Sequence, residues 1–337
     1  MKYLAARLQM AFAVVCLALG AACGQSQPAT PKPDLKIAMI AKSSSNPVFV
    51  SARTGAEAFA KETYDRTGTR IEIAWLTPPA EDGDVQAQRI AQAVTEGANA
   101  VLISCSDAGK VTPAINDAVA HGVPVMTFDS DAPESKRFAF LGIDDVKAGE
   151  SVLEELAEQI GDAGSIAILA GNQNAPNLQK RVEGVKQAAK KHPKLKIVGT
   201  FYHPETPEDA TAEVMKAQTA HPQIKGWAMV GAWPLFTHTL LTALDPAKVK
   251  IVAIDALPAE LAYVKTGLAP VLLAQKTGDW GHESVRAIFD KVHLKKDVPQ
   301  IVRMEPFRVS SENLGTWARL LKRWGFPDVP AEYLTLP

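Results

Sequence analysis

Beyond its first 34 residues the chain lacks any long hydrophobic run, because no stretch of about 18 consecutive apolar residues occurs there. The body from Leu35 onward is therefore predicted to be soluble. An excess of one charge is also lacking, since 36 Lys and Arg accompany 37 Asp and Glu without a long single-sign run. We expect no nucleic-acid surface, and a small or neutral partner fits this balance.

Cysteine is scarce as well. Of the three cysteines, Cys16 falls in the N-terminal apolar run and Cys23 follows that run directly, which leaves Cys105 alone at the end of an apolar segment. No intramolecular disulfide is then expected. We interpret Cys105 as a packed strand-end residue, with a reactive thiol as the alternative.

Catalytic signatures are missing. The chain has no G-x-G-x-x-G, P-loop, G-x-S-x-G or H-E-x-x-H motif, and its seven histidines lack metal-ligand spacing. We predict that the protein is not an enzyme and that it holds no cofactor or metal. A glycosidase-like pair made of Asp129 and Asp255 is the one catalytic alternative, and it is not favoured.

The N-terminus carries an export signal. Lys2 and Arg7 flank the start of an apolar run of about 15 residues, 8–22, which ends in small residues before Cys23. That run is short for a bilayer core of ~30 Å. We predict a signal peptide over 1–22 and lipidation of Cys23. An ordinary cleaved signal or an uncleaved anchor stays open, because Gly20 takes the place where lipoprotein signals usually have Leu.

Residues 23–34 form a candidate tether. The segment is poor in apolar residues and has three prolines after Cys23, so it cannot build a core. An extended Pro-rich chain covers ~3.1 Å per residue. We therefore expect the folded part to lie just off a membrane, in the periplasm or on the cell surface.

The body alternates short apolar runs rich in Val and Ile with amphipathic segments. The runs predict strands at 35–42, 70–76, 100–105, 123–128, 137–142, 165–170, 196–202, 226–231, 250–255 and 269–275. The other segments predict helices at 47–65, 83–97, 109–121, 146–160, 176–191, 207–220, 234–244, 257–266 and 279–292. This order indicates an α/β protein with two parallel sheets, each covered on both faces.

Open parallel sheets bind ligands where strands end and the following helices begin. Several residues occupy such positions in this chain, namely Asn46, Ser104 to Asp107, Asp129 to Asp131, Ala232, Trp233, Asp255 and Gln275. The polar members of this set are predicted to converge on one site.

At these residues the chain resembles the periplasmic sugar-binding proteins of ABC transporters, in the ribose-binding branch that shares its fold with the sugar-sensing domain of LacI-type repressors. The matching stretches include IAMIAKSSSNPVFVSARTGAEAFAKE (37–62), VPVMTFDSDA (123–132), FLGIDDVKAGE (140–150), RVEGVKQA (181–188), TAHPQIKGWAMV (219–230), IVAIDALP (251–258) and LLAQKTGDWG (272–281). The resemblance implies a type I periplasmic binding protein, with two Rossmann-like lobes joined by three chain crossings. The crossings are expected near Asp144, Lys276 and Pro306. The N-terminal lobe would then comprise 35–143 plus 276–306, and the C-terminal lobe 144–275 plus 307–337.

Some residues of this chain match ligand-binding positions of the family's sugar site. Asn46, Asp129, Asp255 and Gln275 match polar ligand-binding positions, and Phe49 matches a ring-stacking aromatic. Departures from the ribose binder also occur. Val48 replaces an aromatic and Ser130 replaces a basic residue. The position of a usual Arg falls at or beside Gln179, with Lys180 and Arg181 adjacent, and the position of a late Asn falls near Ala232, beside Trp233. The resemblance therefore implies the binding mode without fixing ribose as the ligand.

A sugar needs carboxylates and amides around its ring edge and aromatics on its faces. On this basis the predicted ligand-binding residues are Asn46, Phe49, Ser104, Asp129, Ser130, Gln179, Trp233, Asp255, Gln275 and Trp280. Structural roles are the alternative, because Asn46, Asp129 and Asp255 are also candidates for helix caps. Phe49 is likewise a candidate for the core and Trp280 for hinge packing.

We predict an extracytoplasmic solute-binding lipoprotein, monomeric, that captures a monosaccharide and delivers it to the permease of an ABC importer. The alternative is a receptor subunit that reports ligand to a membrane kinase or chemoreceptor. A polyol, a nucleoside and a furanosyl signal also remain open as ligands. The segment 310–326 is predicted to form an amphipathic helix that packs on the second lobe, with transporter docking as its alternative role.

Overall fold

The structure is a computed structural model that describes residues 33–336. The predicted signal peptide, Cys23 and almost all of the tether lie outside these residues. Within residues 33–336 no helix combines the length and the apolar character needed to cross a bilayer.

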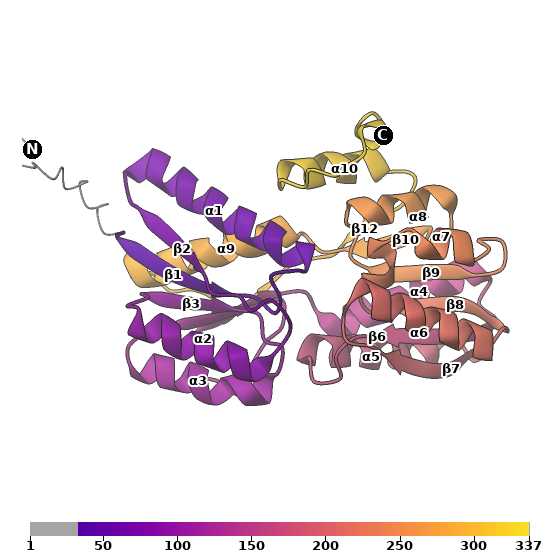
Figure 1. Cartoon of the computed structure of the whole chain (residues 1–337), viewed down its shortest axis with the longest axis horizontal. Coiled ribbons are helices and arrows are strands. Elements are labelled where there is room, and N and C mark those ends of the chain that lie inside the picture. Colours follow the sequence, from indigo (N-terminus) through magenta and orange to yellow (C-terminus); the bar gives the residue numbers. More distant parts are fainter. Residues whose placement is uncertain (1–32, 337) are drawn as a thin grey trace, which may run out of the picture. The chain divides into compact units, whose positions relative to one another are not determined.

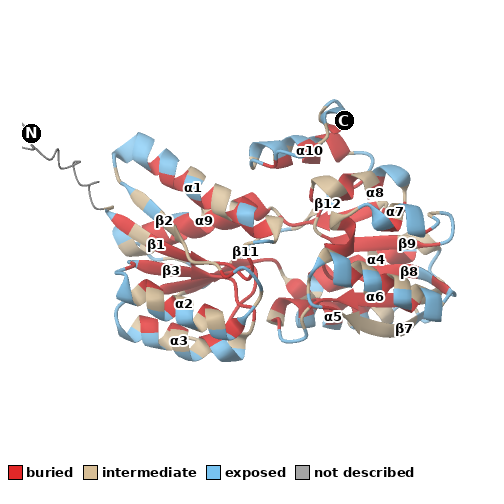
Figure 2. Ribbon diagram, in the orientation of Figure 1, coloured by how far each residue is buried: buried red, intermediate tan, exposed pale blue. Residues whose placement is uncertain are grey.

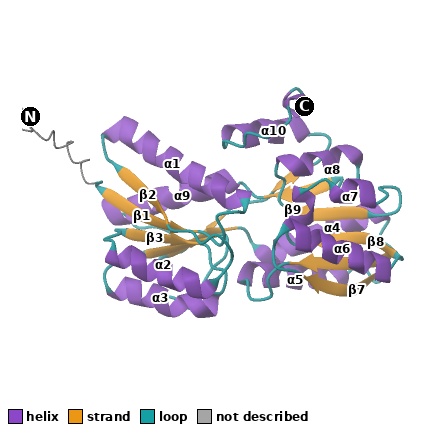
Figure 3. Ribbon diagram, viewed as in Figure 1, coloured by secondary structure: helices purple, strands orange, loops and turns teal. Residues whose placement is uncertain are grey.

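Two six-stranded sheets form the framework (Figure 1, Figure 3). The first has the order β11-β5-β4-β3-β1-β2, and the second has the order β12-β10-β9-β8-β6-β7. The strands of the first sheet are β1 Leu35–Ile40, β2 Ile71–Trp75, β3 Ala100–Ile103, β4 Val125–Phe128, β5 Ala139–Gly142 and β11 Ile301–Arg303. Those of the second are β6 Gly164–Ala170, β7 Leu195–Tyr202, β8 Ile224–Met229, β9 Lys250–Ile254, β10 Val271–Ala274 and β12 Phe307–Val309. Every pairing is parallel except that of β10 with β12, so the predicted α/β class with parallel sheets is confirmed.

Helices connect the strands. They are α1 Pro47–Thr67, α2 Gly83–Thr95, α3 Ala108–Ala120, α4 Asp145–Ile160, α5 Pro176–Ala189, α6 Pro207–Ala220, α7 Thr239–Ala243, α8 Leu261–Thr266, α9 Thr277–Ile288, α10 Leu314–Arg323 and α11 Ala331–Leu334. Short helical turns are η1 Trp233–Phe236, η2 Pro258–Glu260 and η3 Phe289–His293. The helix predicted over 234–244 is therefore wrong in detail. It divides into η1 and α7, because Thr237 between them has an extended backbone.

Strand alternation gives the first sheet two buried faces. Ile37 and Met39 pack in the same cluster as Phe49 and Phe59 of α1. Ala38 and Ile40, which alternate with them along β1, pack in a second cluster with residues of α2 and α3. Side chains alternate across a strand, so a sheet with helices on both sides needs apolar residues at successive positions. Figure 2 shows this pattern as buried central strands beneath helices with one exposed face.

The chain passes between the two sheets three times. It leaves β5 of the first sheet for α4, which contacts β8 and β9 of the second. It returns from β10 to α9, which packs on α1. Last, it runs from β11 in the first sheet to β12 in the second. We call the first sheet with α1, α2, α3 and α9 the N-terminal lobe, and the second with α4 to α8 the C-terminal lobe.

The C-terminal helix α10 packs on the second lobe, as expected. The Trp317 indole N–H donates to the Ala256 carbonyl oxygen at 2.6 Å, and the Trp317 ring stacks on Phe307 with centroids 5.3 Å apart. Beyond the helix, Trp324 lies against Gly278 at the start of α9. The end of the chain therefore contacts elements of both lobes.

Close helix pairs flank the sheets in each lobe. In the C-terminal lobe α4 and α5 approach so closely that a Cβ on Gly149 would meet the Arg181 carbonyl oxygen at 1.9 Å. A Cβ on Gly184 would meet the Val146 carbonyl oxygen at 2.0 Å. Only glycine fits such backbone contacts, so these two residues set the distance between the N-terminal parts of α4 and α5.

Candidate functional site

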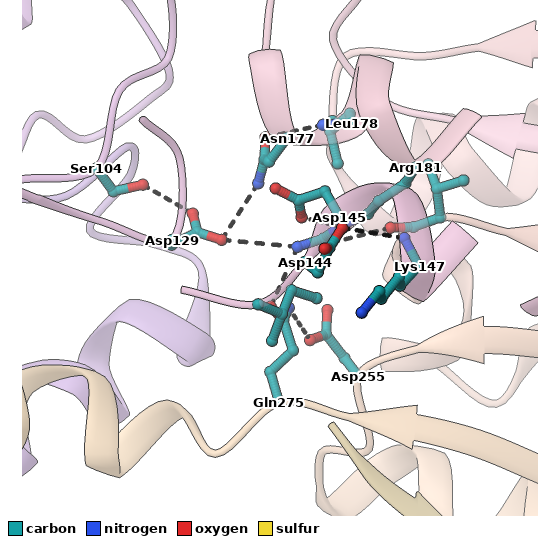
Figure 4. A network of polar contacts seen from close by, with 12 residues as sticks. Ser104, Asp129, Asp144, Asp145, Lys147, Asn177, Leu178, Arg181, Asp255 and Gln275 are labelled. Carbon is teal, nitrogen blue, oxygen red and sulfur yellow. Dashed lines mark hydrogen bonds and ion pairs between the residues drawn. The ribbon is translucent and has the colours of Figure 1, made fainter. Parts of the chain in front are cut away.

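A polar network joins the ends of strands from both lobes (Figure 4). Asp129 follows β4 and has a positive φ of 57°, a conformation that is uncommon outside glycine. Its carboxylate accepts from the Ser104 hydroxyl at 2.7 Å, within the same lobe, and from the Asn177 side-chain amide at 3.2 Å, in the other lobe. Asp129 is only 5% exposed. This carboxylate is therefore a point where the two lobes meet.

Arg181 on α5 holds the network together from the C-terminal lobe. Its Nε donates to Asp145 Oδ1 at 2.9 Å, its Nη1 to the Val230 carbonyl at 3.1 Å and its Nη2 to Gln275 Oε1 at 3.1 Å. Nη2 also lies 3.9 Å from Asp129 Oδ1. Asp145 is the first residue of α4, so the close pairing of α4 and α5 places these two charges together. Burial raises the pKa of Asp145 to about 6, although Arg181 opposes this.

Asp255 and Gln275 extend the network across two adjacent strands. Each follows the end of its strand, β9 or β10, and Gln275 Nε2 donates to Asp255 Oδ1 at 2.9 Å. Asp255 has a positive φ of 97°, which turns the chain sharply out of the sheet. Burial raises the pKa of Asp255, and the Arg181 guanidinium opposes that rise.

Lys42 is a buried cation at the end of β1. It is 2% exposed, and its Nζ donates to Asn177 Oδ1 at 3.3 Å across the two lobes. Burial alone would lower the pKa of Lys42, but nearby Glu81, Glu205 and Asp129 raise it above its usual value. The side chain is therefore held as an ammonium by carboxylates from both lobes.

A cavity of about 950 Å³ lies between the lobes. Its N-terminal-lobe wall includes Ser43, Ser45, Asn46 and Glu81, and its C-terminal-lobe wall includes Asn172, Gln173, Asn174, Tyr202, His203, Glu205, Glu208 and Phe236. Such a volume is at the upper end of the range typical of small-molecule sites. Of the ten residues predicted to bind ligand, Asn46 alone lines this cavity. It also caps α1, because its Oδ1 accepts from the Val48 backbone N–H at 3.1 Å.

The predicted aromatic contacts lie in packed surroundings. The Phe49 ring centroid is 6.4 Å from that of Phe128 and 6.3 Å from that of Trp280, and Trp280 is 1% exposed. These three rings form part of the N-terminal-lobe core. Trp233, in η1, meets the His203 imidazole edge to face at 4.8 Å. His203 lines the cavity, so Trp233 lies directly behind its wall.

Two further predicted residues lie apart from the main contacts. Ser130 is fully buried beside Asp129, and its hydroxyl has no hydrogen-bond partner among the described residues. Gln179 is exposed on α5, and its side-chain amide contacts the Gln173 carbonyl. On α5 the buried Arg181, and not the exposed Gln179, therefore supplies a guanidinium to the network.

Several site residues escaped the sequence prediction. Glu81 follows β2, Asn177 lies beyond β6, and His203 and Glu205 follow β7. All obey the rule that ligands meet strand ends. The sequence prediction took its candidates from the residues after the first, third, fourth, eighth, ninth and tenth strands. It included none from the residues after β2, β6 and β7. Applying the rule to every strand would have found His203, which directly follows β7, whereas Glu81 and Asn177 lie farther along the chain from their strands.

The described residues contain no group of three or more His, Cys, Asp or Glu side chains arranged to hold a metal ion. Cys105 is buried, and burial raises the pKa of its thiol, so it is poorly suited to act as a thiolate.

A family model described as periplasmic binding protein domain matches residues 37–296. The chain belongs to the periplasmic binding protein family. The ribose import binding protein of Bacillus subtilis is 26% identical over 280 residues, which cover 79% of this chain and 84% of that protein.

Solved structures agree with this membership. A solute-binding protein of Burkholderia graminis, determined in complex with D-arabinose, aligns with a TM-score of 0.76 at 24% identity, covering 84% of this chain and 98% of its own. A chain of a XylFII–LytSN complex aligns with a TM-score of 0.75 at 27% identity, and the alignment covers 83% of this chain and 98% of that chain. As a periplasmic binding protein, the chain is an extracytoplasmic solute-binding protein and not an enzyme.

Proposed function

We propose that this protein captures a monosaccharide between its two lobes and delivers it to the permease of an ABC importer. The observation that carries the proposal is the polar network of Figure 4, in which side chains from strand ends of both lobes converge. The ribose import binding protein among its relatives supports a sugar as the ligand. A ligand that touches both lobes stabilises their approach through its differential affinity for the closed form.

Asp129 and Asp255 are the proposed acceptors for sugar hydroxyls. At present their carboxylates accept from Asn177 and Gln275, which are neutral amides. Sugar hydroxyls are equivalent donors, and hydrogen bonds to an ionised acceptor are roughly twice as strong as neutral ones. Ligand binding would then exchange one set of donors for another without leaving either carboxylate unpaired.

Lipidation of Cys23 completes the proposal. A short polar tether after an acylated cysteine would keep the protein beside its permease, and this is supported by the small residues before Cys23 and the prolines after it. An ordinary cleaved signal would instead leave the protein free in the same compartment.

A sensory role is the second candidate. A relative with 27% identity forms a complex with LytSN, which is an example of this fold docked on a protein partner. The ligand site would serve either role. Neighbouring genes for a permease and an ATPase would favour transport.

Calorimetry with a panel of sugars and polyols tests the binding function. Asp129→Asn and Asp255→Asn should each weaken binding of the best ligand by ~5-fold to over 100-fold, because a lost charged hydrogen bond costs about 1–3 kcal/mol. The exposed Asp117→Asn and Lys190→Ala should leave affinity unchanged. Unchanged affinity in both folded cleft variants would show that these acids only stabilise the fold.

A further inference from the structure

The cavity between the lobes has an acidic wall. Glu81, Glu205 and Glu208 line it, and no lysine or arginine is among its lining residues. Glu81 comes from the N-terminal lobe after β2, and Glu205 comes from the C-terminal lobe after β7. Carboxylates that approach from opposite lobes repel one another unless a proton or a cation lies between them.

One carboxyl oxygen of Glu81 lacks a hydrogen-bond donor in this arrangement. The residue is half-buried, but its Oε2 is fully enclosed and has no hydrogen-bond partner among the described residues. A buried carboxylate oxygen without a donor is costly. Burial raises the pKa of Glu81 well above its usual value, and Lys42 opposes the rise. The Glu205 carboxyl adds to the rise through its charge and through a side-chain hydrogen bond with Glu81. Within residues 33–336 Lys42 makes no ion pair at 4.0 Å or less, so its charge acts on Glu81 only from a distance.

Glu205 is held in place. Its Oε1 accepts from the Asn172 backbone N–H at 2.9 Å, and its backbone has a positive φ of 38°. A Cβ on Gly171 would meet the Glu205 side chain at 2.6 Å, so the carboxyl packs closely against the turn after β6. A strained residue fixed by its neighbours is typical of a position that serves a ligand.

His203 provides an independent indication of a ligand. It lines the same cavity and is only 7% exposed, yet neither of its ring nitrogens has a hydrogen-bond partner among the described residues. Burial lowers the pKa of His203 to about 4, so the imidazole is neutral near pH 7 and offers one acceptor and one donor. It adds no positive charge to the wall.

The balance of charge in the whole cleft favours a cation. Lys42 and Arg181 are the buried cations of the site, and they share it with the carboxyl groups of Glu81, Glu205, Asp129, Asp145 and Asp255. A neutral sugar cannot offset this excess of carboxyl groups. An ammonium group can, and its three N–H donors suit two carboxylates and one neutral acceptor.

We propose that the ligand of this cleft is an amine-bearing monosaccharide whose ammonium group is bound between Glu81 of one lobe and Glu205 of the other, beside His203. The inference rests on the proposed sugar-binding function and narrows its substrate class. It also gives the two lobes a reason to close on ligand, because the ammonium takes the place of the proton that the raised pKa of Glu81 otherwise keeps beside Glu205.

Calorimetry near pH 7 on the full mature protein tests this, with D-glucosamine against D-glucose and D-galactosamine against D-galactose as matched probes. At least one amino sugar should bind ~10-fold or more tightly than its neutral parent, as expected for a charge-assisted bond. Glu81→Gln and Glu205→Gln keep the side-chain size and should abolish that preference. Glu134→Gln, an exposed carboxyl far from the cavity lining, should preserve it.

Each outcome is decisive. Neutral sugars that bind as tightly as their amino analogues would overturn the amine assignment and leave the sugar-binding function standing, with a shared proton between Glu81 and Glu205 as the explanation. A preference for amino sugars that survives both glutamine substitutions would also overturn it. If the folded protein binds neither kind of sugar, the proposed function fails and the amine assignment with it.

Discussion

Replacing Arg181 should destabilise the protein more than any change on its exposed helices. The side chain is 2% exposed and makes three hydrogen bonds, to Asp145, Val230 and Gln275. Arg181→Met keeps much of the volume but leaves Asp145 buried without its cation. Removal of one partner from a buried ion pair typically costs 3–5 kcal/mol, and we expect a loss of unfolding free energy in that range near pH 7.

The loss of unfolding free energy in Arg181→Met should depend on pH, because the variant changes the pKa of Asp145. The pKa of Asp145 is about 6 with Arg181 present, and it must rise further without Arg181. Without Arg181 the Asp145 carboxyl of the folded variant takes up its proton at a pH above 6, whereas in the folded wild type it does so near 6. The difference in unfolding free energy between variant and wild type should therefore shrink as the pH falls towards about 6 and stay constant below it. Adding Asp145→Asn to Arg181→Met should likewise recover part of the loss at pH 7.

Urea unfolding followed by tryptophan fluorescence measures both effects. The neighbouring exposed Lys180→Met is the matched control, and its effect should stay within about 0.5 kcal/mol. A loss below about 1 kcal/mol in Arg181→Met, or a loss that does not depend on pH, would refute the argument that Arg181 neutralises a buried carboxylate.

Three further predictions follow from other parts of the molecule. Burial lowers the pKa of His203 to about 4 in the folded protein, whereas a free imidazole has a pKa of about 6.5. As the pH falls from 6.5 to 4 the unfolded chain therefore binds a proton at His203 that the folded protein does not, and the free energy of unfolding should fall by up to about 3 kcal/mol. His203→Phe should remove that part of the pH dependence in urea titrations, whereas the exposed His121→Phe should not. Cys23→Ser should release a correctly cleaved protein from membrane fractions on immunoblots, and continued membrane association would argue against lipidation. Scattering should show a smaller radius of gyration with ligand than without, through rotation at the three crossings, and superimposable curves with a tight ligand would count against closure.

The fold was largely predictable because its signals are local. Ten apolar runs predicted ten strands, and the bounds of each lie within two residues of the observed bounds. The strands β11 and β12 were missed, since each has three residues and exists through pairing with a distant strand, β5 or β10. The division of 234–244 into η1 and α7 was missed for a related reason, because Pro234 is compatible with a helix start but does not fix its length.

The candidate site was less predictable, because its contacts depend on which strand ends face one another across the two lobes. Asp129, Asp255 and Gln275 were predicted as members of one site, and a network of hydrogen bonds and ion pairs that includes Arg181 connects them. Their role in binding ligand stays a prediction. The expected Arg was placed at or beside Gln179 and Gln179 was chosen as the site residue, although Arg181 lies two positions later on the same helix. Two residues on a helix differ by about 200° in direction, so position 179 faces outward where 181 faces in. Only the close packing of α4 on α5 reveals which of them is buried.

The glycine contact between α4 and α5 has a consequence for mutational screens of this protein. Gly149 touches the backbone of Arg181, and the arginine in turn orders Asp145 and Gln275 at the cleft. A methyl group at position 149 would displace that backbone and tilt the guanidinium, even though position 149 makes no ligand contact in any arrangement proposed above. A selection for sugar uptake would therefore score Gly149 and Gly184 as if they were specificity residues. The positions that such a screen identifies would therefore include residues of the α4–α5 interface that ligand does not contact.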